Sequence, residues 1–247
     1  MKKEILIKLL NIAGFLAALY VNYLSVVTQL GGRSIRELSD KYANLFTPSN
    51  QTFAIWSLIY TLVFIFLIAQ FLPSYKSTRF FNSYHFFISC LLNGAWIVAW
   101  QLEYIGLSLL IMFALLATLA IINQQADAEK LLLPKIVFGV YLGWICIATI
   151  ANITTWLVSF KLTIPFSIQV FITLAILIVA AIIVAWIMKM LANPFLAIAV
   201  VWAFYGIYVK RMADVSEIAY TALGMGVLVL LSIGIFSIRP GVRKMQA

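Results

Sequence analysis

The stretch "FTPSNQTFAIWSLIY", residues 46–60, begins as a loop rich in proline and small polar residues and continues as an apolar helix. In a helix, its aromatic residues Phe53, Trp56 and Tyr60 lie three and four positions apart and share one face. Leucine would serve equally well against lipid. An aromatic face therefore indicates either packing against other aromatic side chains or the wall of a binding site.

The composition around this stretch is that of a membrane protein. Of the 247 residues, 64% are hydrophobic and 10% are charged, and the mean hydropathy is +1.06. A bilayer core about 30 Å thick needs about 20 apolar residues per spanning helix. We therefore predict an all-α integral membrane protein. Eight stretches without Asp, Glu, Lys or Arg are long enough to span: 9–30, 52–72, 80–102, 104–126, 136–160, 165–188, 190–209 and 218–238.

Two of these predicted spans have alternatives. The first follows Met1-Lys2-Lys3, but it is too long for a signal peptide and lacks a cleavage site, so we expect it to stay in the protein. The seventh follows Asn193-Pro194 after a very short connection, which leaves a broken or re-entrant helix as an alternative to a full crossing.

The net charge of +9 is explained by orientation in the membrane, and it does not indicate nucleic acid as a partner. Most of the 17 Lys and Arg residues lie on the side of the first residues. The positive-inside rule then predicts that both termini are cytoplasmic. We expect a multi-pass protein of a plasma (cytoplasmic) membrane, of bacterial origin. The basic residues on the predicted cytoplasmic side include Lys2, Lys3, Lys76, Arg79, Lys130, Lys135, Arg239 and Lys244.

Ionisable residues, the usual mark of proton relays and hydrolytic centres in membranes, are missing from the middle of every predicted span. We therefore predict no catalytic residues, no metal site and no enzymatic activity. The single histidine, His85, lies at the start of the third span, where a structural role and iron ligation are both open. Cys90 and Cys146 lie within spans and are expected to pack as small apolar groups.

Two further stretches carry amide and indole groups at helical spacing: "LLNGAWIVAW", residues 91–100, and "YLGWICIATIANITTW", residues 141–156. Asn93 and Asn152 would lose hydrogen bonds if they faced lipid, so their faces should point into the bundle. Trp96 and Trp144 share those faces, and the interior narrows to a small side chain at Ala148. This pattern is typical of a cavity for a flat apolar molecule or of ordinary helix packing with amide hydrogen bonds, and both interpretations stay open.

Together, the three quoted stretches resemble the corresponding helices of the TspO/MBR family, the tryptophan-rich sensory or translocator proteins. The resemblance covers about residues 5–160 and rests on the order of the motifs and on their spacing, including Trp-x-x-x-Ala-Thr-x-x-Asn at 144–152. It implies a five-helix core at 1–160 with a lid at 31–51. It also implies an apolar planar ligand such as protoporphyrin or haem. Some members of the family bind sterols. No obligatory cofactor is implied.

Site candidates come from the helical stripes and from this resemblance. The stripes supply Phe53 and Trp96. The resemblance carries over the remaining candidates onto this sequence: Trp56, Tyr60, Asn93, Trp144, Ala148 and Asn152.

The chain departs from the family pattern in two places. Family members usually carry a double proline and a tryptophan before the second helix, where this chain has Thr47-Pro48 and Asn50, and its lid has no tryptophan. Photochemical degradation of porphyrin is therefore in doubt. Residues 161–247 add three further predicted transmembrane helices to the five, which makes eight in total and a long variant.

These features predict a multi-pass protein that binds, and translocates or senses, an apolar planar ligand within the bundle. The alternative is a regulatory or scaffold subunit without a small-molecule ligand, in which the three extra helices dock another membrane protein. The lipid bilayer is the expected surrounding. Small residues such as Gly94 and Ala95 also permit close contact with a second copy in a homodimer.

Overall fold

The computed structural model describes residues 2–33, 35–75 and 78–237, and within these residues it is helical with no strand. The predicted all-α class is therefore confirmed. The helices are α1 (Lys2–Val27), α2 (Ile35–Lys41), α3 (Ile55–Ala69), α4 (His85–Gln101), α5 (Ile105–Ala128), α6 (Leu132–Ser159), α7 (Phe166–Met190), α8 (Leu196–Arg211) and α9 (Ser216–Ser237). Short 3-10 turns occupy Asn50–Ala54, Pro73–Tyr75 and Phe80–Asn82.

Each predicted span corresponds to one long helix of the described chain, but the helices differ in their ability to cross a bilayer. Six are long and apolar enough to do so: Lys3–Val27, Asn50–Ala69, Ile105–Ala128, Leu132–Ser159, Phe166–Met190 and Ser216–Gly234. The other two, α4 and α8, have 17 and 16 residues. These correspond to about 26 and 24 Å, short of a core about 30 Å thick. A count of eight crossings therefore stays a prediction.

Helix ends differ from the predicted boundaries for local reasons. The third span was expected from residue 80, but residues 80–82 form a 3-10 turn and Ser83 is extended, so α4 begins at His85. The seventh was expected from residue 190, but α8 begins at Leu196 as one continuous helix. Asn193 explains that start, because its side-chain oxygen accepts a hydrogen bond from the Phe195 amide at 3.0 Å.

The tight connections between helices turn at residues in the left-handed backbone region, and most of these residues are not glycine. Such residues end a helix sharply, at a steric cost that glycine would avoid. They are Gln29 (φ 49°), Glu103 (φ 61°), Lys130 (φ 55°), Lys161 (φ 55°) and Ala192 (φ 46°). The turns at Glu103 and Lys130 make the helices that they join antiparallel neighbours, α4 with α5 and α5 with α6, as in other bundles.

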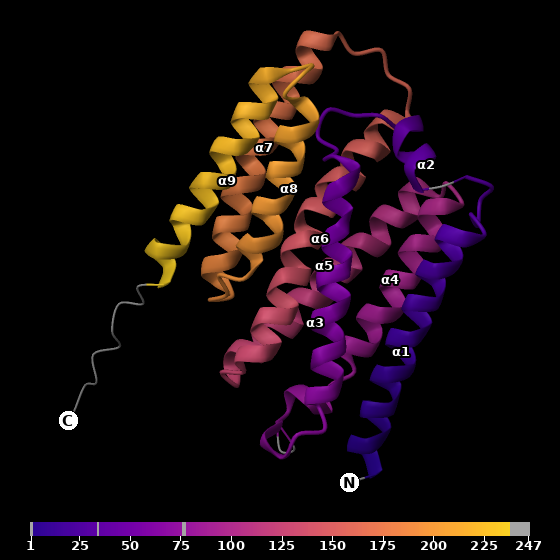
Figure 1. Ribbon diagram of the computed structural model, residues 1–247, viewed down its shortest axis with the longest axis vertical. Helices are drawn as coiled ribbons and strands as arrows, with labels where there is room; N and C mark the ends of the chain where they lie inside the picture. The colour runs from indigo at the N-terminus through magenta and orange to yellow at the C-terminus, as the bar shows by residue number, and fades with distance from the viewer. Residues whose placement is uncertain (1, 34, 76–77, 238–247) are drawn as a thin grey trace.

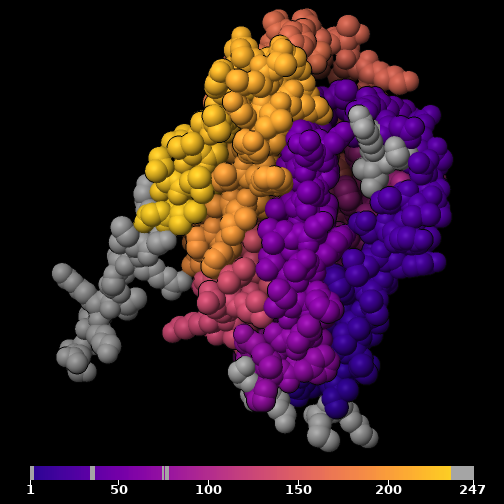
Figure 2. Space-filling view, viewed as in Figure 1, coloured from indigo at the N-terminus to yellow at the C-terminus, as the bar shows by residue number. Residues whose placement is uncertain are grey.

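Five helices form a ring in the order α1, α4, α5, α6, α3, and the ring is closed by a sparse contact between α3 and α1 (Figure 1). In the space-filling view, α3 and α1 stand apart near α2, and deeper helices are visible between them (Figure 2). On the other side of the ring, α8 packs against α6, while α7 and α9 pack mainly against one another and α8.

The contact between α6 and α8 is close and partly polar. A Cβ atom on Gly143 would lie 2.2 Å from the backbone oxygen of Leu196, so only glycine permits this approach. Asn193, fully buried, donates to the side-chain oxygen of Asn123 at 2.7 Å and to the backbone oxygen of Lys135 at 2.8 Å. The last three helices are thus fixed to the ring, and a domain boundary near residue 160 stays a prediction.

Several buried phenylalanine rings pack together near the end of the ring where α1 begins. The Phe66 ring stacks on Phe81 at a centroid distance of 5.2 Å and meets the edges of Phe86 and Phe138 at 5.1 and 5.0 Å. Edge-to-face and offset pairs of this kind add to the energy of area burial. This phenylalanine core anchors α3, α4 and α6 together and leaves the opposite end of the ring to the predicted site.

Candidate functional site

Four of the predicted site residues and one further tyrosine form an aromatic cluster between α3 and α6. The Trp56 ring lies 5.3 Å from Tyr60, 5.8 Å from Tyr141 and 6.4 Å from Trp144. Phe53, which precedes α3 in its 3-10 turn, meets the edge of Trp144 at 5.7 Å. The spacing predicted that Phe53, Trp56 and Tyr60 share one face, and Phe53 and Trp56 use this face to contact α6. We refer to Phe53, Trp56, Tyr60, Tyr141 and Trp144 as the aromatic cluster.

The cluster also reaches α1, where the ring of helices is most weakly closed. Asn22 donates a hydrogen bond of 2.8 Å to the Tyr60 hydroxyl, and Phe15 meets the edge of the Tyr60 ring at 6.1 Å. A tyrosine in an apolar bundle usually finds a partner for its hydroxyl group. The Asn22–Tyr60 bond therefore fixes the orientation of the phenol and joins α1 to α3.

Asn93 is buried in α4 with an amide that lacks hydrogen bonds. Its side chain is 2% exposed, and neither its oxygen nor its nitrogen has a partner within hydrogen-bond geometry. The Tyr141 hydroxyl lies beside this amide and acts on it as a weak hydrogen-bond partner, but the two groups do not meet the full hydrogen-bond geometry. Burying an unpaired amide costs about 1–3 kcal/mol, so a native structure usually has a reason to keep one.

Asn152 behaves differently, because its amide is fully engaged in holding helices together. Its side-chain oxygen accepts a 3.0 Å hydrogen bond from the Trp96 indole, and its nitrogen donates to the Ser108 hydroxyl at 3.2 Å. The three residues come from α6, α4 and α5. This triad confirms the expectation that Asn152 and Trp96 face into the bundle, and it shows them as packing partners in this state.

Six of the eight predicted residues therefore fall into two groups, which no described contact joins directly, while Asn93 and Ala148 belong to neither group. Trp144 belongs to the aromatic cluster and Asn152 to the hydrogen-bonded triad, eight residues further along α6. Ala148 lies between them on the same side of the helix and is partly buried. Its small side chain leaves the space between the two groups less filled than a leucine would.

The segment at 31–51 lies over this end of the ring and is attached to the turn between α4 and α5. Glu103 in that turn accepts hydrogen bonds from Arg33 at 2.8 Å, from Tyr42 at 2.7 Å and from Lys41. The bonds from Lys41 and Tyr42 hold the pKa of Glu103 below its ordinary value. Burial, and then the hydrogen bond to Glu103, raise the pKa of the Tyr42 hydroxyl.

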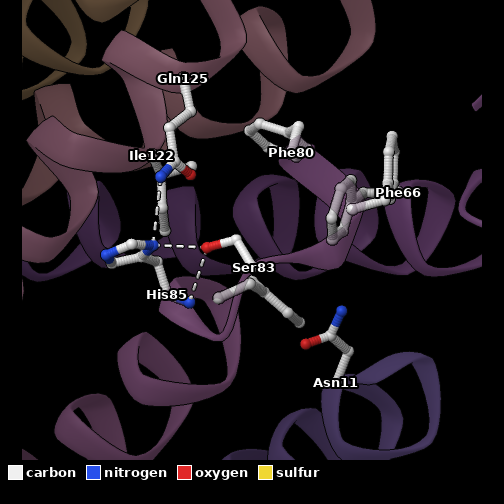
Figure 3. A pocket seen from close by; sticks show the side chains of 9 residues that line it. Asn11, Phe66, Phe80, Ser83, His85, Ile122 and Gln125 are labelled. Carbon is white, nitrogen blue, oxygen red and sulfur yellow. Dashed lines mark hydrogen bonds between the residues drawn. The ribbon is translucent and has the colours of Figure 1, made fainter. Parts of the chain in front are cut away.

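A small cavity lies at the opposite end of the ring, among the phenylalanine rings and the polar side chains of α1, α4 and α5 (Figure 3). Its volume is about 10 Å³, which accommodates about one water molecule and no organic ligand. His85 is at its rim, with Nδ1 lying 2.5 Å from the Ser83 hydroxyl and 3.3 Å from the Gln125 nitrogen. These contacts fit a structural histidine.

Metal chemistry has no cluster of ligands to support it in the part of the chain that the structure describes. No group of three His, Cys, Asp or Glu side chains there is placed to hold a metal ion. Cys90 and Cys146 are both buried free thiols. A haem bound at the aromatic cluster would find flat aromatic walls there but no histidine, since His85 is at the other end of the ring.

Sequence reasoning missed Tyr141, Asn22, Phe15 and Ser108. Tyr141 had a usable signal, because it precedes Trp144 by three residues and therefore shares its face of α6. Asn22 could also have been predicted, because an amide in an apolar span usually points to another helix. Phe15 and Ser108 had none, because nothing in the sequence distinguishes them from ordinary packing residues.

Comparison with known proteins gives one match. A family model described as TSPO-like protein matches residues 8–235, which include the helices beyond residue 160. No curated protein and no solved structure matches the chain. The family match covers more than half of the chain and agrees with the motifs at 46–60, 91–100 and 141–156. This multi-pass membrane protein, which resembles the TspO/MBR proteins in sequence, therefore belongs to the TSPO-like family.

Proposed function

We propose that the protein binds an apolar planar molecule, such as a tetrapyrrole, between the aromatic cluster and α4, and that it moves or senses this ligand. The observation that carries the proposal is the unpaired amide of Asn93, buried in the same bundle as five aromatic rings from α6, α3 and the turn before α3. Aromatic walls with a few polar groups are typical of small-molecule sites. A ligand with a carbonyl, carboxylate or hydroxyl group would give the amide its missing partner.

Room for the ligand requires a rearrangement of the structure as it stands. The Trp56 ring contacts both Tyr60 and Trp144, so a tetrapyrrole must separate these rings or enter beside them. Two features support such a change: the sparse contact between α3 and α1, and a lid held on one side by exposed ion pairs. Binding by conformational opening needs no ion coupling, which agrees with spans that lack central charges.

The alternative role, a scaffold subunit that docks another membrane protein through α7 and α9, makes no use of the buried Asn93 amide. The triad of Trp96, Ser108 and Asn152 is compatible with either role, because its hydrogen bonds hold helices together. The two proposals therefore differ in what the aromatic cluster does, and binding experiments on this cluster separate them.

The test is a titration of the purified protein with protoporphyrin, following both tryptophan quenching and the absorption band of the porphyrin. Wild type should show saturable binding, and Trp144→Ala should weaken it at least tenfold. Trp186→Ala is the matched control, because Trp186 is 60% exposed on α7 and should leave affinity unchanged. Equal affinity of wild type and Trp144→Ala, or the absence of saturable binding of any tetrapyrrole or sterol, would contradict the proposal.

A further inference from the structure

The segment at residues 44–52, which leads into Phe53 and α3, is held by α8, a helix outside the five-helix ring. Arg211 donates from Nε to the backbone oxygen of Leu45 at 3.1 Å and from Nη2 to that of Asn44 at 2.9 Å. Its side chain is 10% exposed, and its remaining nitrogen pairs with Asp214 at 2.6 Å. A buried guanidinium bonded to two carbonyls is costly to remove, because all these groups would be left unpaired.

Two further bonds extend this attachment to the turn from which α3 starts. The Ser49 amide donates to the backbone oxygen of Gly206 at 3.0 Å, and the Trp202 indole donates to that of Thr52 at 2.8 Å. Gly206 is in direct contact with Thr52, because a Cβ atom there would lie 1.9 Å from the threonine hydroxyl oxygen. The backbone immediately before Phe53 is therefore fixed by α8.

Residues 44–47 of this segment are also joined by hydrogen bonds among themselves. The side-chain oxygen of Asn44 accepts hydrogen bonds from the amides of Phe46 and Thr47 and from the Thr47 hydroxyl, at 3.0–3.1 Å. Such a turn is a local structure that the side chain imposes on its own backbone. Phe46 is 1% exposed, and Thr47 and Pro48 are buried.

The other end of the lid is attached by weaker means. Arg33 and Lys41 are 47% and 42% exposed in their ion pairs with Glu103, which is itself 29% exposed. Exposed ion pairs contribute little because water and salt screen them. One apolar side chain of α2, Leu38, is buried, and Asp40 attracts Lys210 of α8. The exposed ion pairs that attach Arg33 and Lys41 to Glu103 are therefore easier to release than the buried attachments of residues 44–52.

We infer that α8 is the fixed hinge of the lid, that Arg211 and Trp202 are positioning residues for the aromatic cluster, and that the lid opens at its Glu103 end. The inference rests on the proposed function for its ligand, but the asymmetry of the lid stands without it. It assigns a role to the C-terminal helices: they hold Phe53 and the start of α3 in place while the rest of the lid moves.

Hydrogen–deuterium exchange of the full chain in nanodiscs tests the asymmetry directly. In wild type, amides at 35–43 should exchange at least tenfold faster than those at 46–52. Glu103→Gln should speed exchange at 31–43 only, and Arg211→Met should speed it at 44–54. Equal exchange at the two ends of the wild-type lid, or an unchanged pattern in Arg211→Met, would overturn the inference.

Ligand kinetics test the consequence for the site, with protoporphyrin as the probe. Glu103→Gln should raise the association and dissociation rates together and leave Kd within threefold, because only the opening changes. Arg211→Met should raise Kd at least tenfold. Asp214→Asn is the matched control, since it removes the ion pair but leaves both carbonyl bonds, and should keep Kd within threefold. The same kinetic change in both lid variants, or wild-type Kd in Arg211→Met, would contradict the hinge.

Two safeguards keep the outcomes separable. If Arg211→Met does not fold, as judged by exchange in α5 and α6, Trp202→Phe replaces it, because this variant loses only the bond to Thr52. The expected changes are then smaller but in the same direction. If wild type binds no protoporphyrin, the proposed function fails while the exchange measurements still decide the hinge.

Discussion

The indole nitrogen of Trp202 donates a 2.8 Å hydrogen bond to the backbone oxygen of Thr52, a residue 150 positions earlier in the chain. Thr52 lies in the turn that leads into α3, one residue before Phe53 of the aromatic cluster. The bond therefore connects the last three helices to the stretch at 46–60. It means that helices beyond the five-helix ring contribute to the geometry of the candidate site.

Replacing Asn93 by leucine should separate stability from binding. The variant removes a buried amide that has no hydrogen bond. We therefore expect the free energy of unfolding to stay the same or to rise by up to about 1–3 kcal/mol. Affinity for protoporphyrin should fall, because the ligand loses its polar partner. Thermal unfolding in detergent and a binding titration measure the two effects. A variant that is destabilised and binds normally would show that the amide serves packing alone.

The opposite result is expected for Asn152→Leu. This substitution removes the acceptor of the Trp96 indole and the donor to Ser108, and leaves both groups buried among three helices. The expected loss is about 1–3 kcal/mol, seen as a lower unfolding temperature. Gln124→Leu is the control, because residue 124 is exposed on α5, where substitutions usually change stability by less than about 0.5 kcal/mol. Equal stability of the two variants would argue against the triad.

Gly143→Ala tests the close approach of α8 to α6. The new methyl group would meet the backbone oxygen of Leu196 at 2.2 Å, and a backbone atom cannot turn aside as a side chain can. We expect a loss of about 1–3 kcal/mol from the forced shift. Gly224→Ala in α9 is the control, because nothing lies within 4 Å of its added Cβ and alanine favours helix. A stable Gly143→Ala protein would place α8 further from the ring.

The attachment of the lid to Glu103 should depend on pH in a defined direction. Because its folded pKa is lowered, this carboxylate stabilises the closed lid fully above its unfolded pKa, and the contribution is lost as pH falls through the folded value. The labelling rate of a cysteine placed at residue 43, divided at each pH by that of a free model thiol to remove the intrinsic dependence on thiolate, should therefore rise at acidic pH, and Glu103→Gln should abolish this rise. If the labelling rate in Glu103→Gln depended on pH as in wild type, Glu103 would be excluded as the titrating group.

Much of the architecture was predictable because membrane helices leave a strong signal. Uninterrupted apolar stretches gave the long helices, and the amides at 93 and 152 indicated which faces turn inward. Helix ends were less predictable, since they depend on side-chain bonds such as that of Asn193 to the Phe195 amide. The start of α4 was misplaced because Phe80 and Phe81, which look like part of the apolar stretch, form a separate turn with Asn82.

The candidate site was predicted in its composition but not in its organisation. Spacing identified the stripe of Phe53, Trp56 and Tyr60, yet it could not show that Trp144 joins this stripe while Asn152 bonds to Trp96. Such partnerships depend on the rotation of each helix about its axis. The contacts of Arg211 with residues 44 and 45 were also beyond reach, because no periodic pattern links residues so far apart in the chain.

The central claim, that a planar ligand occupies the space between the aromatic cluster and α4, is tested most directly by an experimental structure of the protein prepared with protoporphyrin. The account predicts planar density against Trp56 and Trp144, with a polar group of the ligand within hydrogen-bond distance of Asn93. Porphyrin found only on the lipid-facing surface, or a bundle interior unchanged at saturating porphyrin, would contradict it.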